Sequence, residues 1–110
     1  QMDAITAISG SGPAYVFYFI EALQQAAEEA GFAPAQAREL AVETFLGSSK
    51  LAAGSNEPAA VLRQRVTSKG GTTEQALKLF DAHELKTKII EAVRAAQRKS
   101  RELGDELGNH

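Results

Sequence analysis

The sequence contains no cysteine among its 110 residues. This absence excludes disulfide bonds, thiolate zinc sites and a cysteine nucleophile. Long apolar runs are missing as well: the longest extends from Ala14 to Ile20 and ends at Glu21, far short of the roughly 20 residues that a membrane helix needs. The first residues also lack the basic start and apolar centre of a signal peptide. We therefore expect a cytoplasmic protein that does not interact with a membrane.

Blocks of charge of one sign are also absent. Twelve Lys and Arg residues face 14 Asp and Glu residues, which gives a formal net charge of −2. A protein that binds the phosphate backbone of a nucleic acid should show a concentrated basic face, so no nucleic-acid partner is expected. A chain of 110 residues with 44% hydrophobic residues is sufficient for one domain, residues 1–110. Gln1 stands where an initiator methionine is expected, which favours a fragment of a longer protein.

Alternating β-branched runs are missing, and residues that favour helices dominate after the first dozen positions. The pattern predicts an all-α fold of about five helices. A short apolar segment of one or two helical turns (residues 3–8) and a flexible SGSG stretch (9–12) precede them. The five helices are expected at about 13–30, 34–54, a short stretch through 61–62, 72 or 73 to 82, and 84–103, with a frayed end at 104–110.

The expected helix ends follow from residues that commonly begin or stop helices. Gly31 is suited to stopping the first helix, and Pro34 to opening the second. Asn56 is expected to cap the short third helix, with a proline just inside it. Thr72 or Thr73 is expected to cap the fourth helix, with acidic and amide side chains favourably placed in its first turn.

The first predicted helix is apolar nearly all round. One apolar stripe follows positions 16, 19, 20 and 23. The other faces carry further apolar surface from Tyr15, Phe17 and Tyr18. In so short a chain, such a helix usually buries itself against a partner subunit. The second helix carries weak helix formers at 47–49, which close approach of another helix would explain. The chain is thus expected to form a homodimer.

The stretch VTSKGGTT at residues 66–73 combines two glycines with several hydroxyl groups at the start of a predicted helix. Glycines let a ligand approach the main chain, and the first N–H groups of a helix have no partner within the helix. Such a helix N-terminus suits a carboxylate or phosphate. From these residues alone, a tight turn followed by a capping threonine is the commoner explanation. Lys69 precedes the glycines, so the stretch is not a P-loop.

Other residues with reactive or charged side chains give weaker indications of a functional site. Glu21 in the apolar helix is either a poised acid or a charge turned to solvent, the second being more common. His83 and His110 have no metal-ligand spacing, so no metal is expected. The serines lack a suitable histidine base, which argues against acyl transfer.

Two long segments, DAITAISGSGPAYVFYFIEAL and LRQRVTSKGGTTEQAL, resemble the C-terminal domain of pyrroline-5-carboxylate reductase, and the similarity extends over residues 3–103. The resemblance implies an all-α bundle that forms an interlocked dimer, similar to the C-terminal domain of 6-phosphogluconate dehydrogenase. Family members can assemble further into rings of dimers. In the complete enzyme an N-terminal Rossmann domain holds NADPH or NADH, and hydride reduces the C=N bond of 1-pyrroline-5-carboxylate to give proline.

No G-x-G-x-x-G fingerprint occurs in these residues, so this chain is expected to lack the cofactor domain and to be inactive alone, and its cofactor-binding residues stay unknown. The resemblance also implies a substrate site. Ser68 and the main chain at Gly71, Thr72 and Thr73 would hold the substrate carboxylate, and the Thr73 hydroxyl, as the catalytic group, would bond the ring nitrogen. The family commonly has proline where this sequence has Lys69, which loosens the loop and adds a positive charge.

Two other functions stay open. The chain can instead be a stand-alone helical dimer that serves as an interaction module and binds no substrate. A third interpretation is another two-domain dehydrogenase that acts on a different small acid.

Overall fold

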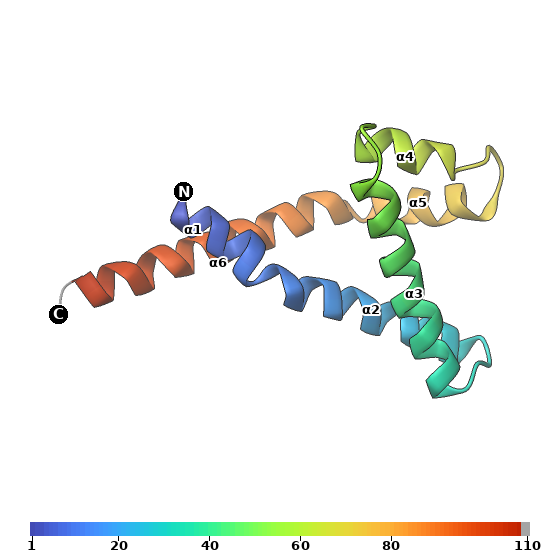
Figure 1. Ribbon diagram of the computed structural model, residues 1–110, viewed down its shortest axis with the longest axis horizontal. Coiled ribbons are helices and arrows are strands. Elements are labelled where there is room, and N and C mark those ends of the chain that lie inside the picture. The colour runs from blue at the N-terminus through green and yellow to red at the C-terminus, as the bar shows by residue number, and fades with distance from the viewer. Residues whose placement is uncertain (109–110) are drawn as a thin grey trace.

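The computed structural model describes residues 1–108 and is built from helices (Figure 1). In chain order these are α1 (Met2–Ile5), the π-helix η1 (Thr6–Gly10), α2 (Gly12–Glu29), α3 (Pro34–Ala53), α4 (Ala59–Arg65), α5 (Thr72–Ala82) and α6 (Leu85–Gly108). Helices α2 to α6 correspond to the five expected from the sequence. No strand occurs in the described part of the chain, which confirms the all-α prediction.

Helices α2 and α3 form a helical hairpin and are joined by a turn that depends on one glycine. Gly31 has φ +108, in the left-handed region that favours glycine. Its N–H donates to the Glu28 carbonyl at 3.0 Å, and the Phe32 N–H donates to the Ala27 carbonyl at 3.1 Å. This pair of bonds is the Schellman pattern that ends many helices, so the predicted stop at Gly31 is confirmed.

The contact between α2 and α3 is made by small residues and one aromatic pair. Ala37 and Ala41 of α3 are buried. Phe19 of α2 and Phe45 of α3 meet edge to face, with ring centroids 5.3 Å apart and an interplanar angle of 67°. Such a pair contributes about 0.5–1.5 kcal/mol beyond its buried area, so it helps to fix the angle of the hairpin.

The N-terminal segment packs against α6, where Ala7 is fully buried. The Tyr15 hydroxyl donates a hydrogen bond of 2.8 Å to the Ala7 carbonyl, and the Ser100 hydroxyl of α6 donates one of 2.9 Å to Asp3 Oδ1. The SGSG stretch, expected to be flexible, instead continues the helix: its first two residues belong to η1, and the Ser11 N–H donates to the Thr6 carbonyl at 2.8 Å. The prediction was wrong because it considered the glycines and serines alone, without the hydrogen bond that Tyr15 supplies.

A single chain has almost no core of its own. Ala7, Ala37 and Ala41 are the buried hydrophobic residues of the described chain. The accessible surface is 8877 Å², whereas about 5900 Å² is expected for a compact protein of this size. The radius of gyration is 17.2 Å, against about 13 Å for a compact domain of this length. Figure 1 shows the reason: α2, α3 and α6 lie along the sides of an open triangle.

The apolar faces of the helices are therefore only partly covered. On α3, the apolar side chains of Leu40 and Leu51 are exposed. A Cβ atom at Gly47 would meet nothing within 4 Å, so the close helix approach expected there does not occur within one chain. Both observations have the same cause, because the apolar pattern of a sequence does not tell which molecule covers a face.

The predicted start of α4 and the predicted end of α6 differ from the structure. Asn56 does not cap α4: Pro58 is the residue before its first turn, and Ser55 Oγ accepts the Glu57 N–H at 3.0 Å instead. Helix α6 continues to Gly108 rather than fraying after residue 103. One glycine inside a helix costs only about 1 kcal/mol, so Gly104 does not end it. None of the described helices is long and apolar enough to cross a bilayer.

Candidate functional site

The connection between α4 and α5 spans residues 66–71 and begins with a tightly bonded end of α4. The Thr67 N–H donates to the Gln64 carbonyl at 3.1 Å, and the Thr67 hydroxyl donates to the Arg63 carbonyl at 2.6 Å. The hydroxyl of Thr67 therefore serves the end of the helix, which leaves the hydroxyls of the following residues for a ligand.

Residues 68–71 then form a four-residue turn. The Gly71 N–H donates to the Ser68 carbonyl at 3.0 Å, and Gly70, the third residue of the turn, has φ +77. Lys69 is not among the residues with positive φ. This combination is that of a type II turn, which requires a residue such as glycine at its third position and often has proline at its second. At Gly71, a Cβ atom would lie 3.2 Å from the Ser68 carbonyl oxygen, so a larger residue would crowd the turn.

Helix α5 starts directly after this turn with unpaired main-chain donors. Gly71 is its N-cap residue, with no side-chain capping hydrogen bond, and Thr72 is its first helical residue. Within residues 1–108, the N–H groups of Thr72 and Thr73 have no hydrogen-bond partner. The prediction that Thr72 or Thr73 caps the helix was therefore wrong, because both lie inside it. The free donors at the positive end of the helix suit an anion.

The four residues predicted to bind substrate lie together in this turn and the first turn of α5. Ser68 and Thr72 are exposed, while Gly71 and Thr73 are half-buried. The Gly71 N–H is already used inside the turn, so the predicted main-chain donors that stay free are those of Thr72 and Thr73. The arrangement offers two N–H groups and three hydroxyls from six consecutive residues.

One chain does not enclose this loop. A cleft of about 320 Å³ lies further along α5 and is lined by residues of α2, α4, α5 and α6, among them Phe19, Arg63, Leu77, Phe80, Leu85 and Ile89. None of the predicted substrate residues lines it. A small ligand at the loop would therefore need further protein surface to be shielded from solvent.

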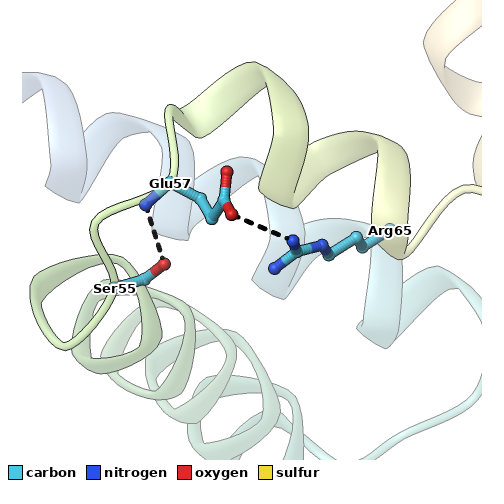
Figure 2. Close-up of polar contacts among 3 residues, drawn as sticks. All are labelled: Ser55, Glu57 and Arg65. Carbon is cyan, nitrogen blue, oxygen red and sulfur yellow. Dashed lines mark hydrogen bonds and ion pairs between the residues drawn. The ribbon is translucent and has the colours of Figure 1, made fainter.

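The loop that precedes α4 is connected to the end of the same helix, as Figure 2 shows. Arg65 Nη2 donates to Glu57 Oε1 at 3.2 Å, and the Glu57 N–H donates to Ser55 Oγ. The Arg65 and Glu57 side chains are 60% and 44% exposed, and such surface pairs contribute about 0–1 kcal/mol. This pair therefore contributes little to the position of the substrate loop.

The remaining candidates lie away from the loop or lack partners for chemistry. Glu21 is exposed on α2, which agrees with a charge turned to solvent. His83 is the residue that ends α5, and it is exposed. His110 lies outside the described residues. The described residues contain no group of three or more His, Cys, Asp or Glu side chains placed to hold a metal ion.

Comparison with known proteins decides the family. A family model described as pyrroline-5-carboxylate reductase dimerisation matches residues 1–103. The chain belongs to the pyrroline-5-carboxylate reductase dimerisation family. The pyrroline-5-carboxylate reductase of Pseudomonas aeruginosa is 44% identical over 108 residues, which cover 98% of this chain and 40% of that protein. The reductase of a Synechocystis species is 47% identical over 103 residues, 94% of this chain and 39% of that protein.

Solved structures of the family have the same fold. The Plasmodium falciparum pyrroline carboxylate reductase with NADP bound superposes with a TM-score of 0.90 at 37% identity, covering 94% of this chain and 39% of that one. The Coxiella burnetii pyrroline-5-carboxylate reductase gives a TM-score of 0.90 at 45% identity, covering 94% and 38%. The chain thus spans about two fifths of the length of the relatives that it matches. A dimerisation domain implies self-association in these relatives, which agrees with the exposed apolar faces described above.

Proposed function

We propose that residues 1–110 form the dimerisation and substrate-loop domain of a cytoplasmic pyrroline-5-carboxylate reductase, which reduces 1-pyrroline-5-carboxylate to L-proline with NADPH or NADH. The observation that carries the proposal is the pair of free N–H groups at Thr72 and Thr73, which follow a glycine turn within the segment that the family model matches. The cofactor supplies the hydride. These residues contain no dinucleotide-binding fingerprint, so the cofactor is held outside them.

In this proposal two copies interlock through the apolar faces that one chain leaves open. The surface in excess of that of a compact monomer is about 3000 Å² per chain. Obligate dimers bury about 2000–5000 Å² in total, so the open faces supply enough area for an interface of that class. Assembly of such dimers into rings would use surfaces that remain outside this interface.

At the substrate loop, the carboxylate of the substrate accepts hydrogen bonds from the Thr72 and Thr73 N–H groups and from the Ser68 hydroxyl. The turn presents Gly71 without a side chain, which allows the carboxylate to approach the main chain. The Thr73 hydroxyl donates a hydrogen bond to the ring nitrogen. Fixing both ends of the small ring orients the C=N bond for attack, and orientation of this kind is a major source of rate.

The experiment that tests this proposal compares wild type with Thr73→Val in the complete gene product that contains these residues. NADPH oxidation is measured as a function of 1-pyrroline-5-carboxylate concentration. A hydrogen bond to a group that carries or develops a charge is worth about 1.5–3 kcal/mol. Its loss should therefore lower kcat/KM by about 10- to 150-fold. Thr87→Val, on the exposed surface of α6, is the matched control and should leave kcat/KM unchanged.

Each result has a definite meaning for the candidate functions. If wild type is active and Thr73→Val is equally active, the site assignment is wrong. If the complete protein dimerises but reduces no 1-pyrroline-5-carboxylate, the interaction module is the better description. A different small imino or keto acid as the preferred substrate would favour the third interpretation, another two-domain dehydrogenase.

A further inference from the structure

Glu74 makes the side-chain contact that holds the substrate loop against α5. Its Oε1 atom accepts a hydrogen bond of 3.1 Å from the Gly70 N–H. Glu74 is the third residue of the helix, the position from which a glutamate commonly reaches back to main-chain donors before the helix. Here Glu74 does not bond the Gly71 N–H, because that group already donates to a carbonyl inside the turn. It bonds the N–H of the preceding residue, Gly70, instead.

The bonded N–H belongs to the peptide that determines the type of turn. Type I and type II turns differ chiefly in the orientation of the peptide between their second and third residues, here Lys69 and Gly70. Reversing that peptide would turn the Gly70 N–H away from Glu74. The hydrogen bond therefore favours the type II form, in which Gly70 has φ +77.

Lys69 explains why this loop needs such a contact. Proline is favoured at the second position of a type II turn because its ring fixes φ near −65°. Lys69 leaves that angle free and so raises the conformational entropy that the loop loses on folding. A hydrogen bond from a neighbouring helix can supply the restraint that lysine lacks.

The Glu74 carboxylate also lies near a lysine. Lys78 Nζ lies 3.5 Å from Glu74 Oε1, one helical turn further along α5. The Glu74 side chain is 30% exposed and that of Lys78 69% exposed, so the pair contributes only about 0.2–0.5 kcal/mol. Lys78 therefore adds only a weak attraction to the Glu74 carboxylate, and the bond to the Gly70 N–H is the contact on which the inference rests.

We propose that Glu74 is a positioning residue of the substrate loop, which holds the turn in the form that presents Ser68 and the free N–H groups of α5 to the substrate carboxylate. This inference rests on the function proposed above. Glu74 does not touch the substrate, and its effect passes through the Gly70 main chain. Because the loop binds the carboxylate in the ground state, loss of Glu74 should act mainly on KM.

The test uses the complete gene product with Glu74→Gln, Glu74→Ala and the double variant Lys69→Pro/Glu74→Ala. Glutamine keeps an oxygen acceptor for the Gly70 N–H, so kcat/KM should stay within about threefold of wild type. Alanine removes the acceptor, and a loss of about 1 kcal/mol corresponds to about a fivefold fall in kcat/KM, mostly as a higher KM. Adding Lys69→Pro should recover most of that loss, because proline restores the restraint. Glu102→Ala, which removes a surface pair with Lys99 on α6, is the control.

A second measurement makes the inference independent of catalysis. Hydrogen–deuterium exchange of the peptide that contains Gly70 should be faster in Glu74→Ala than in wild type and should return toward wild type in the double variant. Unchanged exchange and unchanged KM in Glu74→Ala would overturn the proposal, as would failure of Lys69→Pro to recover either quantity. If wild type reduces no 1-pyrroline-5-carboxylate, the proposed function fails, and the exchange rates alone decide whether Glu74 holds the turn.

Discussion

Phe17 offers the most direct test of the idea that a second copy supplies the missing core. It lies in the first half of α2 and is 65% exposed in one chain. A phenylalanine side chain has about 150–250 Å² to bury, so about 130 Å² of this ring remains open. At about 25 cal/mol per Å², covering that area stabilises the dimer by about 3 kcal/mol per protomer.

A symmetric dimer contains this residue twice, so Phe17→Ala should weaken association by about 6 kcal/mol. Each 1.4 kcal/mol is a factor of ten, which gives about a 10⁴-fold rise in the dimer dissociation constant. Sedimentation velocity over a dilution series of the 110-residue chain measures this constant. Gln25→Ala, at an exposed polar position of the same helix, is the matched control and should change it by less than about threefold.

Two results would refute the reasoning about Phe17. The first is a chain that stays folded and monomeric at tens of micromolar, since the open surface would then need no partner. The second is a Phe17→Ala dimer with the dissociation constant of wild type, which would show that the partner covers another face of α2.

The remaining predictions concern single contacts. Tyr15→Phe removes the hydrogen bond to the Ala7 carbonyl and should lower the free energy of unfolding by about 1 kcal/mol, seen as a fall of several degrees in Tm; an unchanged Tm would mean that water replaces the bond without cost. Gly70→Ala places a side chain at φ +77, where a Cβ atom meets no neighbour within 4 Å, so the cost of about 1–2 kcal/mol is purely conformational and should raise KM for the substrate. Gly104→Ala, inside helix α6, is its control and should slightly stabilise the protein; equal effects of the two substitutions on KM would contradict the assigned turn.

Much of the local structure could be predicted because it depends on near neighbours in the chain. The stop at Gly31 follows from its conformational freedom, and the start of α3 at Pro34 from the fixed φ of proline. The helix ends that were predicted wrongly depend on which of several neighbouring donors and acceptors form hydrogen bonds. Asn56 is a good cap in general, but Ser55 and Pro58 placed the start of α4 elsewhere.

The residues of the candidate site were predicted, but the hydrogen bonds between them were not. Ser68, Gly71, Thr72 and Thr73 came from a resemblance between sequences, and the structure places them in the turn 68–71 and the first turn of α5. That the Gly71 N–H is used inside this turn depends on the backbone angles of its neighbours, which residue types alone do not determine. Glu74, the third residue of the helix, was visible in the sequence as a favourable charge, but its bond to Gly70 was not.

The sequence by itself determined the all-α class, the order of the helices and the family, because these depend on helix propensity, on residues that start or stop helices, and on two long motifs. Only the tertiary structure decided which apolar faces stay open. Apolar residues are selected at buried positions in the same way whether their own chain or a second copy covers them. The open triangle of α2, α3 and α6, with three alanines as its buried hydrophobic residues, shows that the packing partner for the other apolar faces must come from outside residues 1–108 of one copy.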